Sequence, residues 1–134
     1  MVSQENVQLL REVYREWSAG NYAAGRELLD PSLVTVWEEQ FPTAGTYSGP
    51  AAHAEAMREW LAAWDEFSLE PEDFFDAGDS IVVPFVVHAR GRESGVSVER
   101  RWAHVWTLRD GHVVRFEVHL DVASALRAVG LDEQ

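Results

Sequence analysis

Apolar residues in the first half of the chain recur every three or four positions, a spacing typical of helices that bury one face. This spacing predicts a first helix up to Ala19-Gly20 and a short second helix that Asp30-Pro31 stops. Ser48-Gly49-Pro50 predicts the start of a third helix, because proline is favoured in a first turn. Its apolar stripe is His53, Met57, Trp60, Leu61 and Trp64. Residues 33–39 alternate and predict a strand between the second and third helices.

After residue 64 the period changes to two, which is typical of strands. The pattern predicts four long strands over residues 67–75, 81–92, 96–109 and 112–120. The turn at Asp110-Gly111 carries the strongest signal, because a type I′ turn needs φ > 0 at both central residues. Residues 122–129 predict a short closing helix that ends at Gly130.

These elements predict a single α+β domain over residues 1–134. We expect three N-terminal helices on one face of a curved, mostly antiparallel sheet, which together form a cone with an internal pocket. A chain of 134 residues that is 46% hydrophobic and 25% charged has enough material for one globular core.

Composition and charge exclude several classes of function. The net charge is −12, so the surface repels phosphates and we expect no nucleic-acid partner. No apolar run has the length of a membrane span, and the first ten residues lack the features of a signal peptide, so we expect no membrane partner. The absence of cysteine suits a reducing compartment, and we expect a cytoplasmic protein.

The strand predicted over residues 96–109 has an unusual face. Trp102, His104, Trp106 and Leu108 alternate onto one side, so an imidazole lies between two indoles. Histidine titrates near neutral pH and can act as an acid, a base or a donor to an enolate-like oxygen, which makes His104 the candidate catalytic residue. The alternative is a buried neutral histidine bonded to a neighbouring hydroxyl or carbonyl.

The six tryptophans, with other large side chains, predict a pocket for a flat apolar ligand. Its candidate residues are Tyr14, Trp17, Trp37, Glu39, His53, Trp60, Trp64, Phe85, Trp106 and Phe116. Core packing is the alternative for any one of the aromatic residues, and a surface position near the helix start is the alternative for His53. Glu39 is the only carboxylate that the pattern places near His104, and its alternative is a solvated strand end.

The opposite face of the same strands is apolar or neutral where a solvated sheet would be charged, which predicts burial on both faces. We therefore expect a homodimer packed sheet to sheet, with a monomer of mixed surface as the alternative. The residues expected on this dimer face are Val86, His88, Arg101, Val105, Arg115, Glu117 and His119.

The chain carries no motif for a bound cofactor. Its five histidines are scattered over different elements, and no metal-binding motif, glycine-rich phosphate loop or nucleophile elbow is present. We expect neither a metal nor another cofactor.

Four segments carry a resemblance that covers essentially the whole chain: WSAGNYAAGRELLDPSLVTVW, YSGPAA, DAGDSIVV and HVWTLRDGHVVRFEVHLD. With the order of elements, they resemble the SnoaL-like branch of the nuclear-transport-factor-two-like superfamily. The resemblance implies the cone-shaped α+β fold. It does not imply one activity, because this fold serves isomerases, hydrolases, cyclases, dehydratases, ligand carriers and interaction modules.

Position by position, the resemblance argues against the best-known chemistries of this fold. The base of ketosteroid isomerase would fall at Trp37, and the acidic residue of the SnoaL-type polyketide cyclases at about Val118. The Arg and Asp of limonene epoxide hydrolase would fall on the strand that holds Val87 and Ala89. Only His104 is polar at such a position, where ketosteroid isomerase has an oxyanion-hole acid.

The sequence therefore predicts a protein that binds a small apolar molecule, polyketide-like or terpenoid-like, in an aromatic pocket. Cofactor-free isomerase or cyclase chemistry would extend this function, and the sequence leaves open whether the protein is an enzyme. The alternative is a non-catalytic interaction module or scaffold whose interior is filled by its own side chains.

Overall fold

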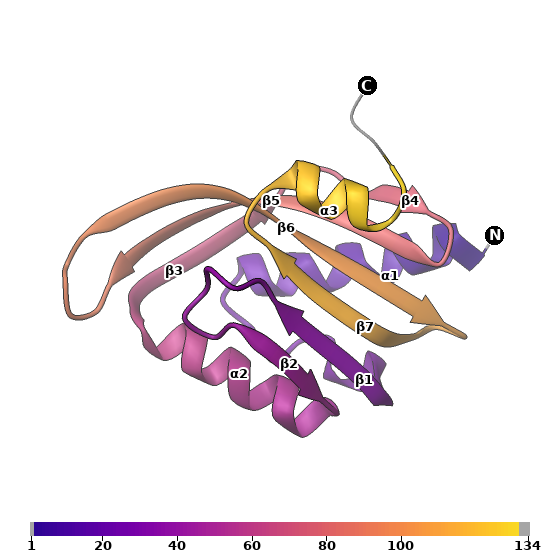
Figure 1. The fold of residues 1–134 in the computed structure, drawn as a ribbon, viewed down its shortest axis with the longest axis horizontal. Helices are drawn as coiled ribbons and strands as arrows, with labels where there is room; N and C mark the ends of the chain where they lie inside the picture. The colour runs from indigo at the N-terminus through magenta and orange to yellow at the C-terminus, as the bar shows by residue number, and fades with distance from the viewer. Residues whose placement is uncertain (1, 132–134) are drawn as a thin grey trace.

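The computed structural model describes residues 2–131, which form three α-helices and one curved sheet (Figure 1). The helices are α1 (Val2–Ser18), α2 (Pro50–Ala62) and α3 (Val122–Ala128), and a 3-10 helix, η1, spans Arg26–Leu28. The strands are β1 (Leu29–Trp37), β2 (Gly45–Ser48), β3 (Trp64–Pro71), β4 (Phe75–Ala77), β5 (Ser80–Gly91), β6 (Ser97–Arg109) and β7 (His112–His119).

The seven strands of the described residues form one sheet in the order β2-β1-β7-β6-β5-β3, with β4 beside β5. Among these described strands only the β1–β7 pair is parallel, because the chain crosses over through α2 and the other strands between them. The predicted mostly antiparallel α+β sheet is therefore confirmed.

The β6–β7 hairpin has the turn that its sequence predicts. Asp110 has φ 54° and Gly111 has φ 78°, so both central residues adopt the positive φ of a type I′ turn. Beyond the turn, the register pairs Trp106 with Phe116 and His104 with Val118. These four side chains lie on the concave face of the sheet.

The prediction of three N-terminal helices is wrong. The expected second helix is only the three-residue η1, because Gly20 and Gly25 adopt positive φ and β1 already begins at Leu29. The third α-helix is the closing helix, α3, near the C-terminus. The expected strand over residues 67–75 is also wrong in its bounds, since β3 begins at Trp64 and β4 is a separate strand.

The helices cover both faces of the sheet rather than one (Figure 1). The main core lies between the concave face and the helices α1 and α2. On the opposite face, α3 packs Val122 and Ala125 against Val82, Ala103 and Val105. Within the described residues no helix is long and apolar enough to cross a membrane.

Candidate functional site

His104 lies in the middle of β6, where strand alternation directs it into the cone. Its side chain is only 5% exposed. The imidazole stacks on Phe85 with ring centroids 4.1 Å apart, and Phe116 lies 4.8 Å away. The expected catalytic candidate is therefore a buried histidine enclosed by aromatic rings.

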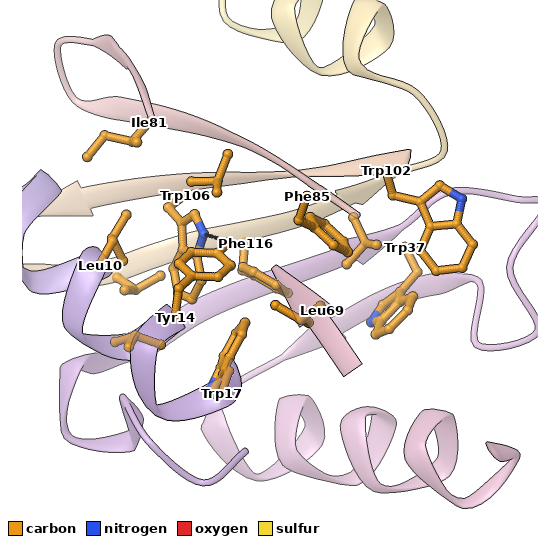
Figure 2. Close-up of a cluster of buried hydrophobic side chains, with 14 of the residues drawn as sticks. Leu10, Tyr14, Trp17, Trp37, Leu69, Ile81, Phe85, Trp102, Trp106 and Phe116 are labelled. Atoms are coloured by element: carbon orange, nitrogen blue, oxygen red, sulfur yellow. Dashed lines mark hydrogen bonds between the residues drawn. The ribbon is translucent and has the colours of Figure 1, made fainter. Parts of the chain in front are cut away.

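A chain of two hydrogen bonds holds this histidine. Trp106 Nε1 donates to the Tyr14 hydroxyl at 2.8 Å, and that hydroxyl lies 2.6 Å from His104 Nδ1. Tyr14 is fully buried on α1 and reaches the sheet from the helix face that packs on it. Figure 2 shows Tyr14 beside Trp106, with the Trp106 nitrogen toward the tyrosine.

The direction of this chain determines the tautomer of His104. An indole N–H can only donate, so the Tyr14 oxygen accepts from Trp106 and its own proton is free to be donated. His104 Nδ1 is the acceptor within reach, so the ring carries its proton on Nε2. Among residues 2–131, Nε2 makes no hydrogen bond, and His104 lines the internal cavity.

Burial keeps both groups neutral. It lowers the pKa of His104 well below its usual value, and the nearby His119 and His53 lower that pKa further. Burial also raises the pKa of Tyr14 well above its usual value, although the hydrogen bond from Trp106 acts in the opposite direction. His104 is therefore a neutral donor at physiological pH and a weak base.

The cavity inside the cone is narrow. Its free volume is about 20 Å³, which has room for about one water molecule. The lining consists of aromatic and aliphatic side chains together with His104: Trp17, Tyr22, Trp37, Met57, Trp60, Leu61, Phe67, Leu69, Phe85, Trp102 and Val118. None of these side chains carries a carboxylate.

A larger groove of about 450 Å³ lies outside this cavity, between α2 and the segment that joins α1 to β1. The groove and the cavity share four lining residues, which therefore separate them: Trp17, Tyr22, Met57 and Leu61. Met57 and Leu61 are half-buried and have flexible aliphatic side chains. Their displacement would connect the groove to the cavity.

His53 lies on the wall of the groove rather than in the cavity. Its Nδ1 is 2.9 Å from the Thr35 hydroxyl, and its ring packs edge-on against Phe116, with centroids 5.4 Å apart. Burial lowers the pKa of His53 to about 4. The structure thus places the two histidines on either side of Phe116 and leaves both neutral at pH 7.

A second aromatic cluster lies at the far end of the cavity. Trp37 contacts Trp60 and Phe41 with centroid distances of 5.3 and 5.4 Å, and Phe41 lies 5.1 Å from Trp102. Three buried polar atoms near this end have no hydrogen-bond partner within residues 2–131: Trp37 Nε1, Trp64 Nε1 and Thr43 Oγ1. Figure 2 shows the nitrogen of Trp37 on the indole edge that faces Leu69 and the interior.

Five expected pocket residues besides His53 do not line the cavity. Tyr14 and Phe116 are buried in the core beside His104, Trp106 lines the groove, and Glu39 and Trp64 lie elsewhere. Glu39 is exposed in the turn after β1, because the strand ends at Trp37, so it is not near His104. Trp64 begins β3 instead of ending α2 and does not line the cavity. Alternation missed the lining residue Tyr22 because it lies in an irregular segment. Trp102 also lines the cavity, shares the parity of His104 and could have been included.

Two residues of the expected dimer face are buried within the chain itself. Val105 is 1% exposed because α3 covers it, and His119 is 7% exposed. The apolar character of this face is thus explained within the monomer. The homodimer stays a prediction, and only part of its expected face remains available for it: Val86, His88, Arg101, Arg115 and the half-buried Glu117.

His119 anchors α3 to the sheet through the carboxylates of Glu38 and Glu117. Its Nδ1 lies 3.0 Å from Glu38 and its Nε2 lies 2.8 Å from Glu117, while Ser124 of α3 donates to Glu38 at 2.8 Å. Burial by itself lowers the pKa of His119, but the hydrogen bond to Glu117 and the charge of Glu38 outweigh it and leave that pKa raised. This network is separate from the cone.

Comparison with known proteins shows to which family this chain belongs. A family model described as a SnoaL-like domain matches residues 10–116. The chain belongs to the SnoaL-like domain family. A search of curated proteins finds no match for this SnoaL-like chain.

Solved structures share the fold of this SnoaL-like domain. An NTF2-like protein from Burkholderia thailandensis is 28% identical with a TM-score of 0.79, and the match covers 90% of this chain and 96% of that one. TerC, co-crystallised with polyporic acid, is 21% identical with a TM-score of 0.75, over 92% and 97% of the two chains. A protein from Jannaschia sp. CCS1, provisionally described as a SnoaL-like polyketide cyclase, is 18% identical with a TM-score of 0.76. The match covers 97% of this chain and 94% of that one.

The chemistry available in this SnoaL-like cone is that of neutral donors. The described lining offers the N–H groups of His104 and Trp37 within an apolar wall, and it contains no carboxylate to act as a base. Neutral donors in a dry site bind carbonyl oxygens and stabilise negative charge that develops on them. Within residues 2–131 no group of three or more histidine, cysteine, aspartate or glutamate side chains could hold a metal ion.

Proposed function

We propose that this SnoaL-like domain binds a small, flat, mostly apolar molecule, polyketide-like or terpenoid-like, whose acceptor oxygen bonds to His104 Nε2–H. The single observation that carries the proposal is a buried neutral histidine with its tautomer determined by Tyr14 and its free N–H in an aromatic cavity. Within residues 2–131 no group accepts a hydrogen bond from this donor, so an oxygen from outside the chain completes it, either of a ligand or of the one water that the cavity has room for. A ligand oxygen would take the place of that water.

The groove supplies the route and the additional volume. A ligand larger than water enters from the 450 Å³ groove when Met57 and Leu61 move aside. The 300 Å³ or so that small-molecule sites typically occupy is then available across groove and cavity. The crystallisation of TerC with polyporic acid supports a site for an organic molecule on this fold.

Cofactor-free isomerase or cyclase chemistry is the catalytic extension of this proposal. An enolate oxygen that forms on the substrate would be stabilised by His104 Nε2–H in the low-dielectric cavity. The proton would have to be removed by a group other than His104, because Nδ1 already accepts from Tyr14 and burial lowers the pKa of the ring. Ligand binding is therefore tested before turnover.

Isothermal titration with 1-tetralone, a bicyclic ketone, tests the proposal. We expect binding to the unmodified protein and at least tenfold weaker binding to His104→Phe, which keeps the aromatic volume beside Phe85 and removes the N–H. The control is His112→Phe, since His112 is exposed at the start of β7 and should bind as the unmodified protein does. Equal affinity in His104→Phe would refute the role of His104.

A second candidate function, an interaction module or scaffold, is favoured by the small free volume of the cavity. In that case the indoles of the cone serve only as a core. Native mass spectrometry of freshly purified protein separates the two candidates without a chosen ligand. A mass excess that disappears under denaturing conditions supports the ligand site, and its absence together with no binding of 1-tetralone supports the scaffold.

A further inference from the structure

His119 lies between two carboxylates on the face of the sheet that α3 covers. Its Nδ1 is 3.0 Å from an oxygen of Glu38, and its Nε2 is 2.8 Å from an oxygen of Glu117. An ionised carboxylate only accepts hydrogen bonds, and a neutral imidazole carries a single N–H. Both contacts are hydrogen bonds only when the ring holds two protons. The arrangement therefore calls for an imidazolium at His119.

The surroundings of the ring leave its charge to these carboxylates. His119 is 7% exposed, so water contributes little to the solvation of that charge. Arg115 of β7 bonds to the other oxygen of Glu117 at 2.7 Å. On β6 the residue paired with His119 is the apolar Ala103, and alternation turns the neighbouring His104 to the opposite face. Burial by itself lowers the pKa of His119, but the bond to Glu117 and the charge of Glu38 leave that pKa raised.

The Glu38 carboxylate also holds α3. Ser124 of α3 donates to Glu38 Oε2 at 2.8 Å, and the Leu120 N–H, just before the helix, donates to Glu38 Oε1 at 2.7 Å. Ser124 Oγ is also the atom of α3 that contacts the ring, at 2.9 Å from Nδ1. Glu38 directly follows β1, so one carboxylate connects β1, the imidazolium of His119 and the helix.

α3 depends on its docking, because it has only seven residues and isolated helices shorter than about 12–15 residues are marginal in water. The helix lies across the sheet (Figure 1). Apart from the Glu38 contacts, Val122 and Ala125 pack on an apolar patch of β5 and β6, the α3 patch, which consists of Val82, Ala103 and Val105. A change that turns Glu38 away from the ring therefore weakens the docking of the whole helix.

We propose that His119 is a pH-dependent latch: its protonated ring holds α3 on the sheet, and loss of the ring proton releases the helix and uncovers the α3 patch. Without that proton, one of the two carboxylates faces a nitrogen lone pair, and both lose the cation between them. Glu117 keeps Arg115 as a partner. Among the ion pairs of residues 2–131, Glu38 has His119 as its one cationic partner, so Glu38 is the carboxylate that turns away.

The sign of the pH effect follows from the two states of the ring. The pKa of His119 is raised in the folded protein above 6.5, its value in the unfolded chain, so the contribution of the latch is complete below pH 6.5. It is lost as the pH rises through the folded value. The latch lies on the sheet face opposite the cavity and does not depend on the ligand proposed for that cavity.

Hydrogen exchange of the α3 amides measures the latch. An undocked helix of seven residues gives its amides little protection, so their exchange rate, corrected for the intrinsic effect of pH, reports docking. We expect the corrected exchange of residues 125–128 to be about tenfold faster at pH 9 than at pH 6, and that of the central β6 amides to be unchanged. The side-chain NMR signals of His119 should titrate above pH 6.5 with the same midpoint.

His119→Gln removes the titrating group and keeps a polar side chain of similar size. In this variant we expect the α3 amides to exchange equally fast at pH 6 and pH 9, at the rate that the unmodified protein reaches at pH 9. His88→Gln is the matched control, because His88 is exposed on β5 and lies outside this network. It should keep the tenfold effect of pH.

Glu117→Gln covers the case in which His119→Gln fails to fold. It replaces one carboxylate beside the ring with a neutral amide, so the midpoints of the His119 titration and of α3 exchange should fall together, by about one pH unit. Midpoints that move apart would overturn the latch. So would α3 exchange that is independent of pH in the unmodified protein, a pH effect that survives in His119→Gln, or a His119 midpoint at or below 6.5.

Discussion

Replacing Tyr14 with phenylalanine tests the hydrogen-bond chain at the centre of the cone. The substitution removes one oxygen atom and leaves two buried partners without a bond, Trp106 Nε1–H and His104 Nδ1. Each stranded polar group costs about 1–3 kcal/mol, so we expect a loss of about 3 kcal/mol in the free energy of unfolding. With an unfolding entropy of about 2.1 cal/mol/K per residue over 134 residues, this lowers the melting temperature by about 10 °C.

Urea unfolding and calorimetry of Tyr14→Phe measure this loss. Tyr47→Phe is the control, because the Tyr47 hydroxyl makes a single bond to the Thr43 carbonyl in a half-buried loop and should cost about 1 kcal/mol. Nitrogen chemical shifts of His104 provide an independent readout, since the unmodified protein should show only the Nε2–H tautomer. A Tyr14→Phe variant no less stable than Tyr47→Phe would refute the assigned hydrogen-bond chain, as would an Nδ1–H tautomer in the unmodified protein.

Three further predictions concern pH and local structure. The pKa of His53 is about 4 in the folded protein and 6.5 in the unfolded chain. The unfolded chain therefore binds the proton first, and the free energy of unfolding falls by about 1.4 kcal/mol per pH unit as the pH decreases between these values. His53→Gln should reduce this slope, measured by urea unfolding at pH 5 and pH 7. Gly25→Ala should lose more stability than Gly20→Ala. Both glycines have positive φ, but only at Gly25 would the new Cβ lie 3.0 Å from the Val13 side chain. Equal melting temperatures of the two variants would contradict this prediction. Asp121→Ala removes the side chain that caps α3 and should lower the free energy of unfolding by about 1 kcal/mol. Thermal unfolding measures this loss, and an unchanged midpoint would mean that the cap is dispensable.

Local signals located most of the sheet and the candidate histidine. Alternation along β6 predicted that His104 faces the interior between Trp102 and Trp106, and the Asp110-Gly111 turn determined the pairing of β6 with β7. These signals are reliable because they act over a few residues and depend on backbone geometry alone. The same reasoning failed for Glu39, because a strand that ends two residues early moves the side chain from the cavity to solvent.

The sequence by itself determined the α+β class, the β6–β7 hairpin and the inward position of His104, since strand period and turn chemistry are properties of short segments. Only the tertiary structure decided that Tyr14, 90 residues away, bonds to His104, and that α3 covers Val105. It also decided that Trp37 and His104 lie on either side of Val118. The physical reason is that these contacts depend on how helices dock and on the register of distant strands, and both are determined by the packing of the whole core.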